Sequence, residues 1–90
     1  MNPGQANELA TLRARLDAID ARLVETLAER ARMVREIWDW KRRNGVERTD
    51  PAREAEVRER LLASAAAQGL DREAVDEVLR AVIGRSLSRR

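Results

Sequence analysis

Two cations on one helical stripe are the residues of this chain whose type and spacing could most directly do chemistry. Lys41 is the only lysine beside seventeen arginines. Arginine is a planar fork that suits carboxylates, whereas lysine is a compact charge that can reach a single atom. On a helix, Arg30 and Lys41 share a face about 16 Å apart, with Val34 and Ile37 between them. The spacing indicates an apolar trough with a cation at each end, which suits an organic anion.

A purely structural explanation exists for each cation. Basic side chains at the edge of an apolar seam can extend to water, or pair with Glu25 or Glu29. Arg13 is a third candidate, but it lies about 25 Å from Arg30 along the helix axis and on a different face. It could reach the same pocket only from a second, antiparallel chain. Otherwise it is a solvated charge beside Asp17, four residues further on.

The cations lie on a helix of unusual length. Residues 8–43 contain no glycine or proline, and their apolar side chains recur at nearly heptad spacing. These positions are Leu9, Leu12, Leu16, Ile19, Leu23, Leu27, Val34 and Ile37. The helix would run about 54 Å, too long for a globule of this size, so it needs partners along its length. We expect residues 1–7 to be a flexible leader and residues 8–90 to form one helical domain.

Capping signals delimit two shorter helices. Gly45 ends the long helix, Asp50 caps the second, which we expect to stop at Gly69, and Asp71 caps the third. There is no strand signal, so the sequence predicts an all-α fold with one long helix and two shorter helices. Because three helices of such unequal length do not close a bundle alone, we expect an intertwined homodimeric helical bundle.

The composition excludes several classes of site. Cys and His are absent, which rules out disulfides, thiolate nucleophiles and histidine acid–base catalysis. Nothing clusters the carboxylates, so we expect no metal. The net charge is only +2, and acidic residues are interspersed among the arginines, unlike a nucleic-acid-binding stripe. The apolar runs are too short for a membrane span or a signal peptide, and the default location is the cytoplasm.

Three motifs occur in order along the chain. L-R-x-x-[IL]-D-x-[IL]-D begins at Leu12, L-x-x-R-x-x-[LMV] at Leu27, and D-P-x-R-E at Asp50. With Lys41 in register, the chain from Leu9 to Ser88 resembles the all-helical chorismate mutases. The resemblance implies an intertwined dimer whose two active sites are each completed by the other chain. It also implies the rearrangement of chorismate to prephenate in aromatic amino-acid biosynthesis, a unimolecular reaction that needs no nucleophile, metal or cofactor.

The resemblance assigns roles to the cations and to two carboxylates. Arg30 and the partner subunit's Arg13 would hold the two substrate carboxylates. Lys41 would donate to the ether oxygen as the C–O bond breaks. Asp50 and Glu54 would take the ring hydroxyl. Their alternative roles are the N-cap of the second helix for Asp50 and a favourable first-turn charge for Glu54.

Further implied contacts come from the ends of the helices. Arg53 would orient neighbouring carboxylates or the substrate, and Ser86 would lie near a substrate carboxylate. Arg90 stands where the family usually has Gln or Glu to assist the lysine, and it could substitute as a donor. A short third helix would also suit mutases that act well only when docked to another shikimate-pathway enzyme. The apolar walls would be Ile37, Val57 and Ile83.

Trp38 and Trp40 depart from the family pattern. They flank Asp39 directly before Lys41, where family members usually have small or polar residues. Two rings so close to the cation could reshape the pocket. Trp40 lies on the heptad line of the apolar seam, so we expect it to pack in the dimer interface, with Trp38 half exposed.

Other functions fit the same residues. A lyase that removes pyruvate from isochorismate, or a mutase for an amino analogue of chorismate, would use the same fold. The pair of Asp50 and Glu54 favours a substrate with a ring hydroxyl or amine. A helical dimerisation module without catalysis would tolerate neutral residues in place of Arg30 and Lys41.

Overall fold

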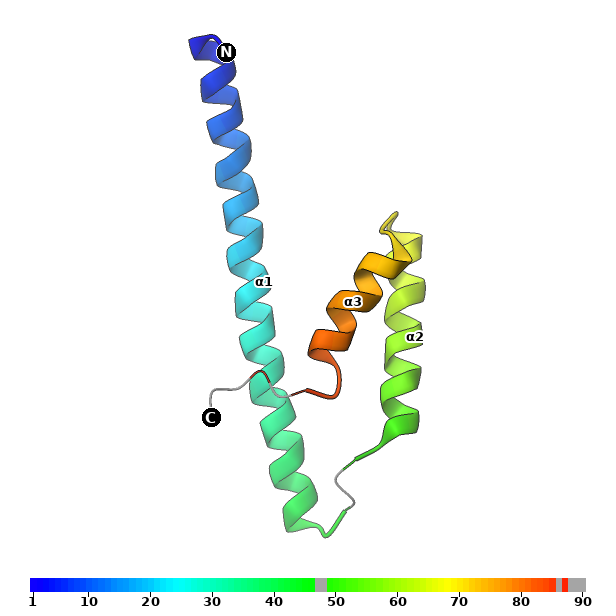
Figure 1. The fold of residues 1–90 in the computed structure, drawn as a ribbon. Helices are drawn as coiled ribbons and strands as arrows, with labels where there is room; N and C mark the ends of the chain where they lie inside the picture. The colour runs from blue at the N-terminus through cyan, green and yellow to red at the C-terminus, as the bar shows by residue number, and fades with distance from the viewer. Residues whose placement is uncertain (47–48, 86, 88–90) are drawn as a thin grey trace.

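Three α-helices make up the computed structural model, which describes residues 1–46, 49–85 and 87 (Figure 1). They are α1 (Pro3–Arg43), α2 (Pro51–Ala67) and α3 (Arg72–Val82). The described residues contain no strand. The predicted all-α class, with one long and two shorter helices, is therefore confirmed.

The first helix begins earlier than the sequence led us to expect. The segment predicted as a loose leader is helical from Pro3 onward, because Asn2 and Gln5 form a capping box. The side chain of Asn2 accepts a hydrogen bond from the backbone N–H of Gln5 at 2.8 Å, and the Gln5 side chain accepts from the N–H of Asn2 at 3.0 Å. Such reciprocal bonds satisfy two orphan donors. Proline fits the first turn, where its missing N–H has no partner to lose.

The other helix boundaries follow the predicted signals. Asp50 and Asp71 cap α2 and α3 by accepting backbone N–H bonds at 3.0 and 2.9 Å. α1 and α2 each end just before a glycine with positive φ, 64° at Gly45 and 79° at Gly69. Glycine adopts this left-handed conformation without steric cost, so it closes the last turn of each helix.

The helices α2 and α3 pack on each other and run in opposite directions (Figure 1). They are the one helix pair among the described residues whose Cα atoms approach within 8 Å. Leu62 is 2% exposed and Ala65 is 5% exposed. No other described residue is buried, so the apolar core within one chain is very small.

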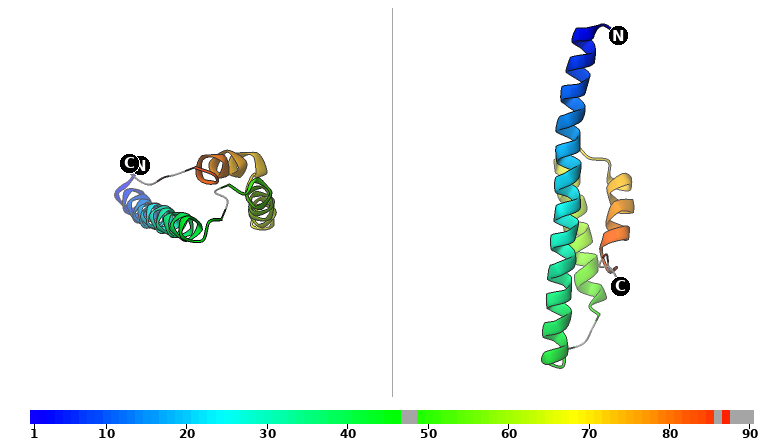
Figure 2. Two further views of the ribbon diagram at one scale, coloured as in Figure 1. Left: turned by 90° about the horizontal axis from the view of Figure 1, so that it is seen from below. Right: turned by 90° about the vertical axis from the view of Figure 1, so that its left-hand side faces the viewer.

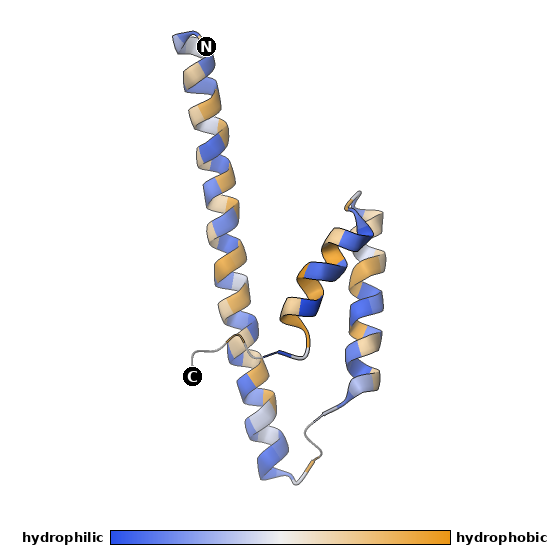
Figure 3. Cartoon of the chain, in the orientation of Figure 1, coloured by the Kyte–Doolittle hydropathy of each residue, from blue (hydrophilic) through white to orange (hydrophobic). Residues whose placement is uncertain are grey.

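α1 stands apart from this pair, as Figure 1 and the left-hand view of Figure 2 show. It has 41 residues and none of them is buried. Its apolar side chains recur along the whole helix (Figure 3), yet Leu16 and Leu23 remain 55% and 56% exposed. The radius of gyration is 18.1 Å, against about 12 Å for a compact domain of this length. The single chain therefore leaves a long apolar stripe uncovered.

The apolar stripe of α1 covers only part of the helix surface, unlike the surface of a membrane span. Searching the described residues finds no helix both long and apolar enough to cross a bilayer. Charged residues separate the apolar positions along α1, as on a helix that packs against another protein surface.

Candidate functional site

Arg30 links α1 to the end of α3. Its Nη1 donates a hydrogen bond to the backbone carbonyl of Val82 at 3.2 Å. The last carbonyls of a helix lack intrahelical partners and carry partial negative charge, so a guanidinium stabilises them. No ion pair to Glu25 or Glu29 is found for Arg30 within the described residues. A guanidinium has five N–H donors, so the bond to Val82 leaves other donors that could bind a carboxylate.

Lys41 lies near the C-terminal end of α1 and is half-buried. Its Nζ is 5.8 Å from the centroid of the Trp38 ring. Trp38 is half-buried, as predicted, while Trp40 is 52% exposed. Ile37, predicted to form part of an apolar wall, is half exposed on the single chain. Lys41 and Arg30 therefore mark the two ends of one segment of α1.

Glu54 is in the first turn of α2 and lies close to Gly84, two residues beyond the end of α3. A Cβ atom placed on Gly84 would lie 3.0 Å from Glu54 Oε2, and Gly84 has a φ of 75°. The left-handed backbone favours glycine at this position, and a Cβ there would also require the Glu54 carboxylate to shift slightly. The end of α3 is thus brought against the Glu54 carboxylate.

An open groove of about 240 Å³ lies between α2 and α3 beside this contact. Pro51, Glu54 and Ala55 line one side of it, and Leu79 and Ile83 the other. Ligand pockets typically occupy about 300–1,000 Å³ and enclose most of the ligand. The groove of one chain is therefore smaller and more open than a complete small-molecule site.

The remaining predicted residues are not all gathered at this groove. Arg13 is exposed on the N-terminal half of α1. The carboxylate of Asp50 accepts the backbone N–H of Arg53, and the Arg53 side chain pairs with Glu56 at 3.5 Å. Val57 is half-buried on α2. Ser86 and Arg90 lie outside the described residues.

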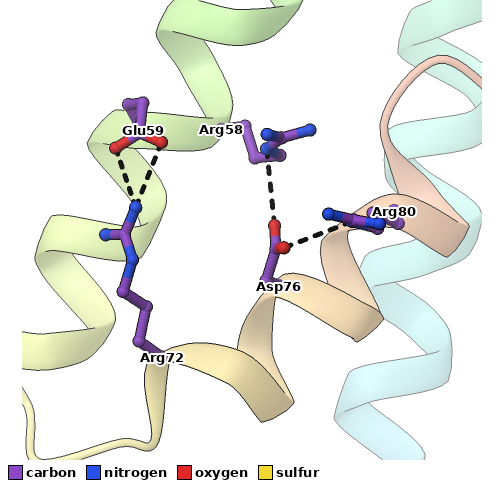
Figure 4. A network of polar contacts seen from close by, with 5 residues as sticks. All are labelled: Arg58, Glu59, Arg72, Asp76 and Arg80. Atoms are coloured by element: carbon purple, nitrogen blue, oxygen red, sulfur yellow. Dashed lines mark hydrogen bonds and ion pairs between the residues drawn. The ribbon is translucent and has the colours of Figure 1, made fainter.

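An ionic network that the sequence analysis missed fixes α3 against α2 (Figure 4). Asp76 of α3 lies between Arg58 of α2, with Nε and Oδ1 3.4 Å apart, and Arg80, with Nε and Oδ2 3.2 Å apart. At the other end, Arg72 donates to both carboxylate oxygens of Glu59 at 3.1 and 3.0 Å.

The Arg58–Asp76 contact is electrostatic. Arg58 Nε and Asp76 Oδ1 are both shielded from solvent and form no hydrogen bond of good geometry. Since these atoms have lost water, their mutual attraction is screened less than that of a surface pair. The network links α3 to α2 at two points along the helix pair.

Comparison with known proteins identifies the family. Residues 12–90 match the family described as chorismate mutase type II. The chain belongs to this family. The chain is also 40% identical over 67 residues to a 4-amino-4-deoxychorismate mutase of Streptomyces venezuelae. That match covers 74% of this chain and 65% of the relative, just under two thirds of its length. The comparison with solved structures found no match.

The family match confirms the resemblance inferred from the three motifs. The matched region contains Arg30, Lys41 and Glu54 together with the Gly84 turn. The N-terminal turns of α1 before residue 12 lie outside it.

The ionic network yields a prediction about stability. Asp76→Ala should lower the free energy of unfolding by about 1–2 kcal/mol, because it leaves Arg58 partly buried without its counter-charge. Glu56→Ala is the matched control. Glu56 also lies between two arginines, Arg53 and Arg60, but its side chain is 68% exposed, whereas that of Asp76 is 24% exposed.

We expect Glu56→Ala to change the unfolding free energy by less than about 0.5 kcal/mol. Urea unfolding followed by circular dichroism, at one fixed chain concentration, measures both effects. Equal losses in the two variants would show that the Arg58–Asp76 contact does not stabilise the packing of α3 on α2.

Proposed function

We propose that the protein is a mutase for 4-amino-4-deoxychorismate, with chorismate as the second candidate substrate. The observation that carries the choice is the 40% identity to a 4-amino-4-deoxychorismate mutase over 74% of the chain. The motifs alone favoured chorismate and left the amino analogue as an alternative. The identity to this relative favours the amino analogue as the substrate. The family itself rests on the match of residues 12–90.

The reaction requires shape and electrostatics from the protein. In the rearrangement the ether C–O bond breaks while a C–C bond forms within the same molecule, and no atom leaves. The protein must hold a dicarboxylate in its compact conformer and stabilise negative charge that develops on the ether oxygen. A chain without Cys or His can provide both through arginine and lysine.

Within this proposal, each cation has a task that suits its chemistry. Arg30 offers its remaining N–H donors to one substrate carboxylate, which gives charge-assisted bonds. Lys41 places a compact charge at the ether oxygen. Arg13, too distant along the same helix, would serve the second carboxylate from the partner subunit.

The contacts made by the two acidic residues, Asp50 and Glu54, support the amino substrate. Asp50 already accepts the N–H of Arg53 as the cap of α2, so Glu54 is the better placed of the two to bind the ring substituent. Among the described residues Glu54 forms no ion pair. With no arginine among the described residues to offset its charge, the Glu54 carboxylate can form an ion pair as well as a hydrogen bond with an ammonium group, whereas a hydroxyl offers the hydrogen bond alone.

The uncovered stripe of α1 supports a homodimer as the working form. A second copy with its long helix antiparallel would cover the apolar positions and bring the partner subunit's Arg13 toward the groove. The shape of the single chain, 64 × 28 × 17 Å, fits such an intertwined arrangement. Docking to another enzyme of the shikimate pathway remains a further expectation.

Substrate choice can be tested directly. Purified protein is incubated with 4-amino-4-deoxychorismate, chorismate or isochorismate, and the products are identified by mass spectrometry. We expect rearrangement, with kcat/KM at least about tenfold higher for the amino compound. Glu54→Gln should reduce this preference, since an amide can bond a hydroxyl but cannot neutralise an ammonium group. The exposed Glu56→Gln is the control.

Two results would contradict this proposal. A preference for chorismate that Glu54→Gln leaves unchanged would assign the enzyme to chorismate. Release of pyruvate from isochorismate as the main activity would identify a lyase on the same fold.

Lys41 generates a second prediction. Lys41→Ala and Lys41→Arg should each lower kcat by about 10²–10³-fold, because the lysine acts on charge that exists mainly in the transition state. Arginine keeps the charge but cannot place it on a single oxygen in the same way. The neighbouring Arg42, which pairs with Asp39, provides the control: Arg42→Ala should leave kcat within about twofold. Steady-state kinetics that show near-wild-type kcat in Lys41→Ala would exclude Lys41 as the donor.

A further inference from the structure

The turn that follows α3 lies against two of the groups that the proposed function places on the substrate. The backbone carbonyl of Val82 accepts a hydrogen bond from Arg30 Nη1 at 3.2 Å. Two residues further on, a Cβ atom placed on Gly84 would lie 3.0 Å from Glu54 Oε2 and 3.4 Å from Glu54 Oε1. This short turn is therefore in contact with a cation of α1 and a carboxylate of α2.

Glycine at position 84 meets two separate requirements. Its φ of 75° is left-handed, a conformation that favours glycine. Gly45 and Gly69 share this conformation, with φ of 64° and 79°, but a Cβ atom on either of them would meet no atom within 4 Å. The backbone therefore explains all three glycines, whereas of the three Gly84 alone also leaves space for a carboxylate.

The group that a side chain at position 84 would displace is the end of a flexible side chain. At a separation of 3.0 Å, the Glu54 carboxylate would have to move by a few tenths of an ångström. The buried residues Leu62 and Ala65 lie further along α2. A substitution of Gly84 should therefore change the position of the Glu54 carboxylate and leave the packing of α2 on α3 in place.

We propose that Gly84 is a positioning residue for substrate specificity, because its missing side chain lets the Glu54 carboxylate lie where the ring substituent of the substrate binds. The inference rests on the proposed function, which gives Glu54 that role. A charge-assisted hydrogen bond is short and depends on geometry. Since a misplacement of about 1 Å can cost about 100-fold in rate, a shift of a few tenths of an ångström should have a smaller, measurable effect.

Substrate preference gives the first test. Gly84→Ala should lower the ratio of kcat/KM for 4-amino-4-deoxychorismate to that for chorismate by about two- to fivefold. Gly69→Ala is the matched control, since it adds the same Cβ to the same backbone conformation with no neighbour to displace. An unchanged ratio in Gly84→Ala, or an equal fall in Gly69→Ala, would overturn the proposal.

A double variant tests whether Gly84 acts through Glu54. In a Glu54→Gln background, Gly84→Ala should cause no further change in the ratio, because the charge whose position it alters is gone. Such non-additivity is the mark of two residues that act through one contact. If Gly84→Ala has the same effect in both backgrounds, it does not act through the Glu54 carboxylate and the proposal is wrong.

The position of the carboxylate can also be observed without an activity assay. In protein labelled with ¹³C at glutamate, the NMR signal of the Glu54 carboxyl carbon is identified by its absence from Glu54→Gln. Gly84→Ala should shift this signal, because it changes the surroundings of the carboxylate, and Gly69→Ala should leave it in place. A signal that Gly84→Ala does not shift would contradict the proposed contact.

A second pair of variants protects the comparison against loss of folding. Alanine is strained at positive φ, so Gly84→Ala and Gly69→Ala should lower the midpoint of urea unfolding by similar amounts. Asparagine tolerates the left-handed conformation better and still adds the Cβ atom. If either alanine variant does not fold, Gly84→Asn and Gly69→Asn are compared in its place, with the same results expected.

The outcomes separate this proposal from the proposed function. If Gly84→Ala shifts the Glu54 signal but leaves the substrate ratio unchanged, the specificity role is wrong and the mutase assignment stands. If the wild type prefers chorismate, or rearranges neither compound, the proposed function fails. The NMR comparison of Gly84→Ala with Gly69→Ala would then still decide whether Gly84 sets the position of Glu54.

Discussion

The main constraint on the structure is the exposed apolar stripe of α1. This helix has 41 residues, and neither α2 nor α3 covers its apolar stripe. Only Leu62 and Ala65 are buried among the described residues. Burial of apolar surface is the dominant favourable term in folding, and so small a core is a weak basis for a stable domain. Covering the stripe of α1 with a second protein surface would therefore bury the most apolar area. A second copy of the chain offers a surface of matching length.

The same constraint shapes the candidate site. Along α1, Arg30 and Lys41 are fixed by the helix itself, and α2 and α3 present Glu54 and the Gly84 turn as a separately packed unit. The described link between these two parts is the bond from Arg30 to the Val82 carbonyl. Ionic contacts around Asp76 hold α3 on α2. One chain supplies these groups and an open groove, and we propose that a second copy of the chain supplies the missing wall.

Much of the fold was predictable because its signals are local. Asp50 and Asp71 correctly predicted where two helices start, and Gly45 and Gly69 correctly predicted where two helices end. The reciprocal cap of Asn2 and Gln5 is also local, but the prediction of a loose leader gave it no weight, and the helix start was placed too late. The uninterrupted helical spacing of apolar residues correctly predicted that the first helix would be very long.

The contacts that could not be predicted from the sequence depend on how α2 and α3 pack against each other. The i,i+4 spacing of Asp76 and Arg80 is visible in the sequence, but the approach of Arg58 from another helix is not. The closeness of Gly84 to Glu54 likewise requires the packed pair. The contact between Lys41 and Trp38 could have been predicted from the sequence, because the two residues are three positions apart on one helix. The choice between chorismate and its amino analogue rests on Glu54 and on a relative.

The proposed sharing of each site between two chains is tested most directly by mixing inactive chains. Arg13→Ala and Arg30→Ala chains, each inactive alone, are mixed at equal amounts and allowed to exchange. Heterodimers would contain one site with both arginines intact, so the mixture should recover about a quarter of wild-type activity per chain. In the matched control, wild type mixed with the double variant should lose about half of its activity, because no mixed dimer has an intact site. If the first mixture stays inactive and the control keeps full activity, each site belongs to one chain and the account is wrong.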